Sequence, residues 1–246
     1  MKIDQTIQLA FTAHKEGRLE EAEQLYKKII KIQSENINIY NNLGLILKDL
    51  DKIEEAETNF KKALEINPNF VEAYINLGNL YKIFEKLDEA EIYFNKAIEC
   101  KPDHAIAYNN LGLTLIKLDK KKEAEISFEK AIKFKPDYAE AYYNSAILYY
   151  SLKKFELAEK YYKKAIDNKS DYAEAYNNLS KLIKEKELFK ILQKQNKRTS
   201  FKKTRLINNP FTLVRKVDVD LVNNLHKINT TKLNENIADV GYLRYG

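Results

Sequence analysis

The sequence has 246 residues, with one cysteine, four prolines, six glycines and no tryptophan. The lone thiol, Cys100, excludes an intrachain disulfide and favours a reducing compartment. Few prolines and glycines, together with 32% charged residues, argue against a turn-rich β protein and favour helices. No segment approaches the roughly 18 apolar residues of a membrane span, and the N-terminus lacks the apolar core of a signal peptide. We therefore expect a cytoplasmic protein without a membrane span.

Residue combinations that carry catalysis are also missing. The three histidines, His14, His104 and His226, lie far apart, and no Cys-x-x-Cys, His-Glu-x-x-His or glycine-rich phosphate loop occurs. The repeated Glu-Ala-Glu triplets place their carboxylates on different faces of a helix, so they do not form an acid–base pair. We predict no catalytic residue, no metal site, no cofactor and no small-molecule substrate, and hence no enzyme activity within these residues.

The first three quarters of the chain have no excess of positive charge. Residues 188–246 hold twelve Lys and Arg against four Asp and Glu, whereas residues 1–187 hold 30 against 32. The net charge of +6 therefore belongs to the C-terminal quarter. A partner that is recognised by a basic surface would have to bind there.

A 34-residue repeat fills most of the sequence. The pentapeptide Tyr-Asn-Asn-Leu-Gly at 40–44 returns unchanged at 108–112, with near copies at 74–78, 142–146 and 176–180. Prolines recur in the same frame at 68, 102 and 136, and an alanine followed four residues later by an aromatic recurs in every unit. The units are 3–36, 37–70, 71–104, 105–138 and 139–172, with a partial unit over 173–187. Such a period indicates a stacked array of small units.

Within each unit the apolar residues follow two helical stripes that are separated by a short polar turn. Each unit is therefore predicted to be two antiparallel helices that bury their apolar faces by stacking on neighbouring units. Gly44, Gly78 and Gly112 fall inside the first helices, where glycine costs about 1 kcal/mol relative to alanine. We interpret them as points of close approach to the partner helix.

This pattern resembles the tetratricopeptide repeat (TPR) family. The resemblance covers 3–187 and rests on the recurring Tyr, Leu-Gly, Ala, aromatic and Pro positions. It implies an all-α, right-handed superhelical solenoid whose first helices line a concave groove, with a closing helix after the last unit. The run Ala-Tyr-Asn-Asn-Leu-Gly is similar to the TPR superhelix found with O-linked N-acetylglucosamine transferases, in which a column of asparagines lines the groove.

The third letter of each pentapeptide forms a column of asparagines: Asn42, Asn76, Asn110, Asn144 and Asn178. At about 100° per residue, this column lies away from the buried tyrosine two residues earlier and is expected to face the groove. A carboxamide can pair with both the C=O and the N–H of an extended peptide. Alternatively, the asparagines are simply tolerated on a wet helix face. Neighbouring columns supply further groove residues, among them Glu72, Asn79 and Glu140, and make the lining mixed and slightly acidic.

The sequence therefore predicts a protein-interaction scaffold that binds an extended, neutral or modestly basic protein segment. The alternative is a substrate-recruiting module of a larger enzyme, because 211–246 reads as a strand at 211–217, a helix at 219–228 and the start of a truncated domain. Since TPR arrays often precede transferases or oxygenases, the resemblance implies that this domain is glycosyltransferase-like or another transferase or oxygenase. A closing helix and basic linker over 188–210 suggest a third function, binding of an anionic polymer. We do not expect nucleic-acid binding, because Phe201 alone offers little base stacking.

Overall fold

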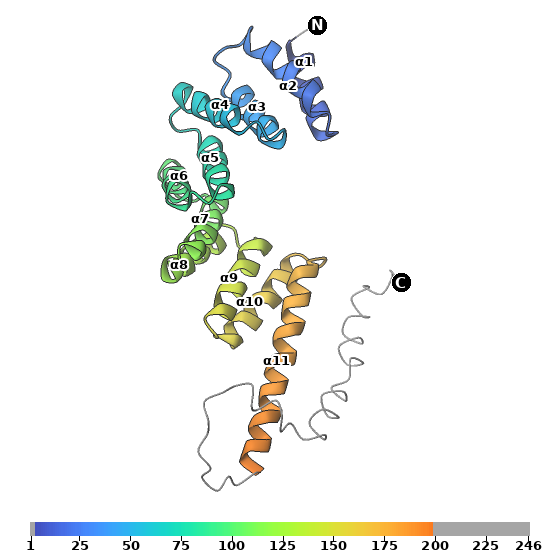
Figure 1. Ribbon diagram of the computed structural model, residues 1–246, viewed down its shortest axis with the longest axis vertical. Coiled ribbons are helices and arrows are strands. Elements are labelled where there is room, and N and C mark those ends of the chain that lie inside the picture. The colour runs from blue at the N-terminus through green and yellow to red at the C-terminus, as the bar shows by residue number, and fades with distance from the viewer. Residues whose placement is uncertain (1–2, 199–246) are drawn as a thin grey trace. The chain divides into compact units, whose positions relative to one another are not determined.

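The protein is described by a computed structural model over residues 3–198, with side chains to residue 192 (Figure 1). This part of the chain contains helices and no strand. The helices are α1 (Ile3–Lys15), α2 (Leu19–Ile30), α3 (Ile37–Asp49), α4 (Ile53–Ile66), α5 (Val71–Ile83), α6 (Leu87–Cys100), α7 (Ala105–Lys117), α8 (Lys121–Phe134), α9 (Ala139–Ser151), α10 (Phe155–Asn168) and α11 (Ala173–Arg198).

The first ten helices form five hairpins, one for each full repeat unit, as the sequence predicts. We number them 1 to 5 and call α1, α3, α5, α7 and α9 the first helices and their partners the second helices. Each second helix packs against its own first helix and against the first helix of the next hairpin. Figure 1 shows the hairpins following one another along the chain in this stacked arrangement. The all-α solenoid expected from the 34-residue period is therefore confirmed.

The described residues fall into two compact units, one ending at Ser170 and the other beginning at Asp171. Hairpins 1 to 5 make up the first unit, and α11 belongs to the second. The sequence predicts a longer helix near 173–195, and α11 runs from Ala173 to Arg198. The predicted strand at 211–217, the predicted helix at 219–228 and the rest of the linker lie outside the described residues.

Close contact between the two helices of a hairpin depends on the mid-helix glycines. A Cβ atom added at Gly44 would lie 2.5 Å from the Phe60 ring, and one at Gly112 would lie 2.6 Å from the Phe128 ring. Gly78 has the same relation to Phe94, at 2.7 Å. These distances are too short for a side chain, so the predicted role of the glycines in helix packing is confirmed. Hairpins 1 and 5 instead carry an alanine in this position and a tyrosine in place of the phenylalanine: Ala10 with Tyr26 and Ala146 with Tyr162.

The turn inside each hairpin has one residue in the left-handed region, always at the same position of the repeat: Gly17, Asp51, Glu85, Asp119 and Lys153. In hairpin 2 the Asp51 amide donates to the Lys48 carbonyl at 3.0 Å and the Lys52 amide donates to the Leu47 carbonyl at 2.8 Å. This is the Schellman arrangement, which closes a helix C-terminus and sets the direction of the next helix. Two backbone hydrogen bonds thus hold non-glycine residues in a conformation that costs them about 1–2 kcal/mol.

Candidate functional site

Exposed or half-buried positions recur on the first helices at the same four places, which are spaced i, i+4, i+7 and i+11. In α5 they are Glu72, Asn76, Asn79 and Ile83. This spacing defines one stripe along a helix. Because α3, α5, α7 and α9 pack successively against one another, the stripes adjoin, and we call the surface that they form the first-helix face. It is the surface on which the sequence places the candidate binding residues.

The second position of each stripe carries a side-chain amide. Asn42, Asn76, Asn110 and Asn144 are half-buried there, at the bottom of the first-helix face. Hairpin 1 continues the column with Gln8, which is exposed on α1. The sequence interpretation missed Gln8 because the first unit lacks the Tyr-Asn-Asn-Leu-Gly frame. Counting 34 residues back from Asn42 would have found it.

Two asparagines of the column are bonded to the preceding hairpin. Asn76 donates through Nδ2 to Asn41 Oδ1 at 2.8 Å, and Asn144 donates to Asn109 Oδ1 at 2.9 Å. The acceptors Asn41 and Asn109 are second letters of the pentapeptide and are 7% and 5% exposed, so each needs a partner. These asparagines therefore also hold successive hairpins together, a role that the sequence analysis did not assign to them.

The asparagines of the column in hairpins 2 and 4 differ from this pair. Asn42 donates to the Tyr26 hydroxyl at 3.5 Å, a long contact at the limit of hydrogen bonding. Burial raises the pKa of Tyr26, so its hydroxyl stays protonated at neutral pH. The preceding hairpin has Ile75 at the position that Asn41 and Asn109 occupy in the other two joints, and within the described residues the Asn110 side chain has no hydrogen-bond partner. Asn110 thus differs from Asn76 and Asn144, whose side chains are bonded to the preceding hairpin.

Flanking positions give the first-helix face two different borders. The first position of the stripe holds Asp4, Asn38, Glu72, Ile106 and Glu140, all of them exposed. The third position holds mainly apolar side chains, namely Phe11, Leu45, Leu113 and Ile147, with Asn79 in hairpin 3. A row of amides thus lies between a partly acidic border and an apolar one.

Asn178, the last predicted member of the column, lies in the second unit. It is half-buried on α11 and has interactions of its own. The described geometry of the first-helix face is therefore that of hairpins 1 to 5, and Asn178 stays a prediction from the repeat frame.

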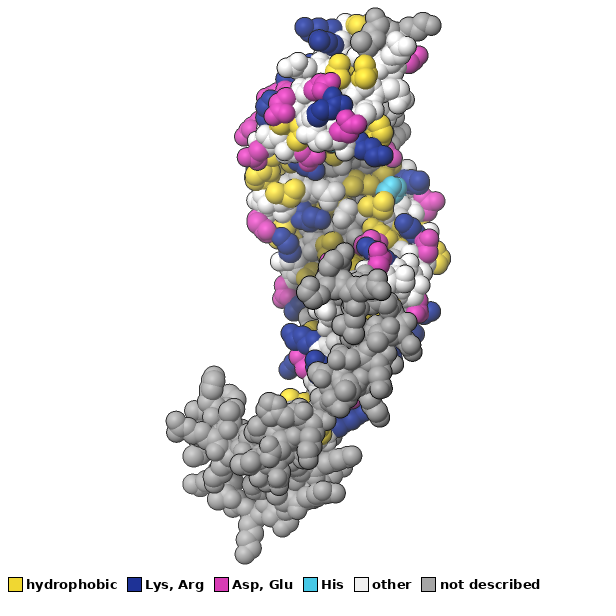
Figure 2. Space-filling view, turned by 90° about the vertical axis from the view of Figure 1, so that its right-hand side faces the viewer, with side chains coloured by type: hydrophobic (Ala, Val, Ile, Leu, Met, Phe, Trp, Pro, Cys, Tyr) yellow, Lys and Arg dark blue, Asp and Glu magenta, His cyan; other side chains and the backbone are white. Residues whose placement is uncertain are grey.

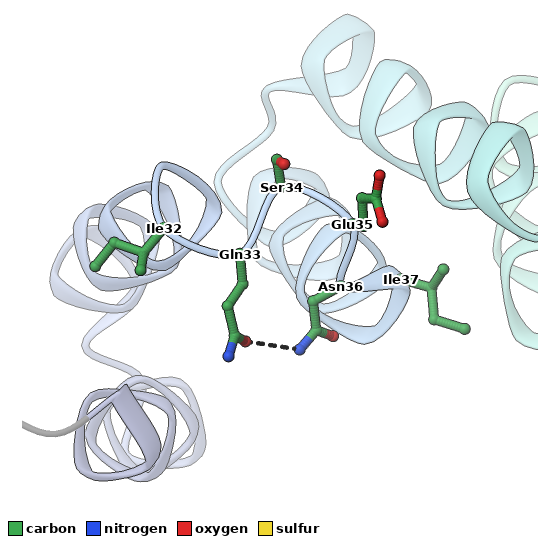
Figure 3. Close-up of a pocket in the computed structure, with 6 residues that line it drawn as sticks. All are labelled: Ile32, Gln33, Ser34, Glu35, Asn36 and Ile37. Carbon is green, nitrogen blue, oxygen red and sulfur yellow. Dashed lines mark hydrogen bonds between the residues drawn. The ribbon is translucent and has the colours of Figure 1, made fainter.

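Surface hollows occur in the described part of the chain, one of them away from the amide column and one at its end. One, of about 600 Å³, is lined by six consecutive residues, 32–37, of the loop between α2 and α3 (Figure 3). Here α2 ends at Ile30, and Ser34 stands where units 2 to 4 have a proline. The Asn36 amide donates to Gln33 Oε1 at 3.1 Å, so these two side chains are bonded to each other within the loop. The second hollow, of about 570 Å³, lies on α1 beside Gln8 and Leu9.

In the described part of the chain, His104 and Cys100 have structural roles. No group of His, Cys, Asp and Glu that could hold a metal ion occurs between residues 3 and 198. His104 caps α7 by accepting a hydrogen bond from the Ala107 amide at 3.3 Å, and burial lowers its pKa. Cys100 packs partly against the core at the end of α6. None of the helices described is long and apolar enough to cross a membrane.

Charge is mixed on the first unit. On the face shown in Figure 2, Lys and Arg side chains alternate with Asp and Glu, and hydrophobic side chains are exposed between them. Many of the charged groups are paired, for example Lys120 with Glu91 at 2.7 Å. This face therefore has no broad surface of one sign for a polyanion.

Stacked two-helix units with small residues at the helix crossing define a class of helical solenoids that act as scaffolds for other proteins. The chain belongs to the tetratricopeptide repeat family. Family models described as tetratricopeptide repeat match residues 37–70, 69–136 and 139–172, and one described as TPR repeat matches residues 13–51. Proteins of this family are generally scaffolds for protein interaction rather than enzymes.

Solved structures agree with this assignment. MamA is 26% identical, with a TM-score of 0.58 over 67% of this chain and 96% of MamA. YrrB, described as a TPR protein with an unusual peptide-binding site, is 25% identical, with a TM-score of 0.55 over 70% of this chain and 89% of YrrB. TTC0263, a TPR protein of Thermus thermophilus, is 19% identical, with a TM-score of 0.62 over 74% of this chain and 98% of its own. A search of curated protein sequences gave no match.

Proposed function

We propose that the protein is an interaction scaffold that holds an extended segment of a partner protein along the amide column of the first-helix face. The observation that carries the proposal is the amide of Asn110, which has no hydrogen-bond partner within the described residues and lies between Asn76 and Asn144 in the column. An asparagine inside a helix is a mediocre helix former, and this one stabilises no neighbouring side chain in the described residues. A ligand that forms hydrogen bonds with this side chain would account for an asparagine at this position.

The amides on either side of Asn110 support the same mode. Asn76 and Asn144 each spend one N–H on the preceding hairpin, which fixes the orientation of the side chain. The second N–H and the Oδ1 of each have no partner among the described residues. An extended peptide presents a C=O and an N–H at every residue, so three oriented amides can bind its backbone with little dependence on its sequence. The peptide-binding site described for YrrB, which has the same fold, is consistent with this proposal.

The test is a selection of random 12-residue peptides displayed on phage, with the full chain as bait. Selected peptides are then synthesised and their Kd values measured by fluorescence anisotropy. Asn110→Ala is expected to weaken binding about two- to tenfold, because one or two hydrogen bonds of about 0.5–1.5 kcal/mol are lost. Its unfolding midpoint should stay unchanged.

Asn95→Ala is the matched control, since Asn95 is exposed on the second helix α6. It should leave the Kd as in the wild type. Failure to enrich any peptide, or equal Kd values for the wild type and Asn110→Ala, would refute the proposed binding mode.

A further inference from the structure

We infer that the bound segment carries Lys or Arg side chains about six residues apart on one side of its extended chain, and aliphatic side chains on the other side. This inference rests on the proposed function and names the chemistry of its partner. It comes from the two borders of the amide column.

The acidic border has a carboxylate in every second hairpin. Asp4 lies on α1, Glu72 on α5 and Glu140 on α9, and Asn38 and Ile106 occupy the hairpins between them. All three carboxylates are exposed, and none has an ion-pair partner within the described residues. This is notable in a unit where lysines pair with many other acids, such as Glu23, Glu85 and Glu91. Carboxylates that remain unpaired beside a row of amides are available to a basic ligand.

The repeat fixes the spacing of the basic residues. Glu72 and Glu140 are separated by two steps between neighbouring first helices, and packed helices lie about 8–10 Å apart. Two steps are therefore about 16–20 Å, which an extended chain covers in about five to six residues at roughly 3.3 Å per residue. Side chains of an extended chain alternate between two sides, so two that point to the same border need an even separation. About six residues meets both conditions.

The apolar border determines the other side of the peptide. Phe11 is 55% exposed and Ile147 is 37% exposed, and Leu45 and Leu113 lie between them in the third position of the stripe. Residues of the peptide that alternate with the basic ones would face this border. Aliphatic side chains fit there, because they remove apolar surface of both partners from water. An acidic tail or a nucleic acid would instead meet the unpaired carboxylates and be repelled.

The same phage selection tests this inference through the sequences that it returns. With the wild-type chain, we expect Lys or Arg to be enriched at two positions about six residues apart, with aliphatic residues at positions of the opposite parity. With the Glu72→Lys/Glu140→Lys variant, we expect Asp or Glu to be enriched at the same two positions. Both glutamates are exposed, and an unchanged circular dichroism melt would show that the variant folds.

The control variant, Glu99→Lys/Glu129→Lys, has the same net charge but changes exposed residues of the second helices α6 and α8. It should return the wild-type pattern. For a selected peptide, Glu72→Gln should weaken binding about two- to fivefold, and less at high salt. Peptides that bind through Asn110 but show no spaced basic residues would refute this inference and leave the proposed function standing. A selection without any binder would refute both.

Discussion

The repeat is the same throughout, but neighbouring hairpins are held together by different interactions. Hairpins 2 and 3 are joined mainly by hydrogen bonds, and hairpins 1 and 2 mainly by ion pairs. We call the contact between two neighbouring hairpins a joint. The joint between hairpins 2 and 3 has the Asn76–Asn41 bond and a hydrogen bond of 2.7 Å from the Tyr81 hydroxyl to Glu57. The joint between hairpins 1 and 2 has ion pairs, including Lys52 with Glu23 at 2.8 Å and Lys27 with Glu55 at 3.5 Å.

The difference alternates along the array. The joint between hairpins 4 and 5 repeats the first kind, with the Asn144–Asn109 bond and with Tyr149 beside Glu125. A longer contact of 3.4 Å from Lys154 to Glu125 accompanies them. The joint between hairpins 3 and 4 repeats the second kind, with the ion pairs Lys120–Glu91 and Lys117–Glu85, both at 2.7 Å.

Besides the 34-residue period, the interactions between hairpins therefore alternate with a period of two hairpins. One position reads Leu47, Tyr81, Leu115 and Tyr149 in successive hairpins. The apolar core has the same two-hairpin period, because one buried cluster joins mainly hairpins 1 and 2 and another joins mainly hairpins 3 and 4. Asparagine–asparagine hydrogen bonds thus connect one pair of hairpins to the next, and within each of the first two pairs the hairpins share a buried apolar cluster. The acidic border of the first-helix face has the same two-hairpin period.

Removing an asparagine–asparagine hydrogen bond between two hairpins should cause the largest loss of stability. Asn144→Ala leaves the Oδ1 of Asn109 buried without a donor, which costs about 1–3 kcal/mol. Asn110→Ala removes the same side chain from a joint that has no such bond, and its effect should stay within about 0.5 kcal/mol. Urea unfolding of the full chain, followed by circular dichroism, measures both. Equal midpoints for the two variants would mean that the Asn144–Asn109 hydrogen bond does not contribute measurably to stability.

This comparison also limits how Asn144 can be used as a binding probe. A loss of peptide affinity in Asn144→Ala would combine a missing contact with a weakened joint. Asn110 does not have this ambiguity, and it is therefore the residue on which the proposed function is tested.

The hairpins could be predicted from the sequence because their signals are local. Helical spacing of apolar residues, the recurring glycine and the phenylalanine 16 residues after it are all visible within one unit. The left-handed residues of the turns were not predicted, since only Gly17 has the residue type that favours this conformation. Asp51 and Lys153 adopt it because the two Schellman hydrogen bonds impose it.

The candidate site could be predicted only in part. The asparagine column and the residues Glu72 and Glu140 follow from the repeat frame. The pairing of Asn76 with Asn41 does not, because it joins different letters of two pentapeptides, 35 residues apart. Finding it requires the relative placement of successive hairpins, which a pattern within one unit does not contain.

Tyr81→Phe should cause an intermediate loss of stability. Burial raises the pKa of Tyr81, so its hydroxyl remains a hydrogen-bond donor at neutral pH, and it donates to the Glu57 carboxylate. Losing this charge-assisted bond should cost about 1–2 kcal/mol. Tyr74→Phe on the same helix is the control, because no hydrogen bond of the Tyr74 hydroxyl occurs in the described part of the chain. It should change the urea midpoint little, and a loss as large as that of Tyr81→Phe would assign the effect to the ring environment instead.

The smallest expected effect is the loss of stability in acid that comes from the ion pairs between hairpins 1 and 2. Burial raises the pKa of Glu23, but the hydrogen bonds from Lys27 and Lys52 lower it more, and the net pKa lies below 4.5. The unfolded chain therefore binds a proton at this residue before the folded chain does. Its contribution to stability is present above pH 4.5 and is lost as the pH falls through the lower pKa of the folded state.

Glu23→Gln removes this contribution, so its urea midpoint should fall less steeply between neutral pH and about pH 3.5 than that of the wild type. Glu57, whose pKa is also lowered, by its bonds with Lys61 and Tyr81, titrates in both proteins and cancels in the comparison. Glu20→Gln, at an exposed position of the same helix, should follow the wild-type curve. Parallel curves for Glu23→Gln and the wild type would show that the stability of the joint between hairpins 1 and 2 does not depend on this carboxylate.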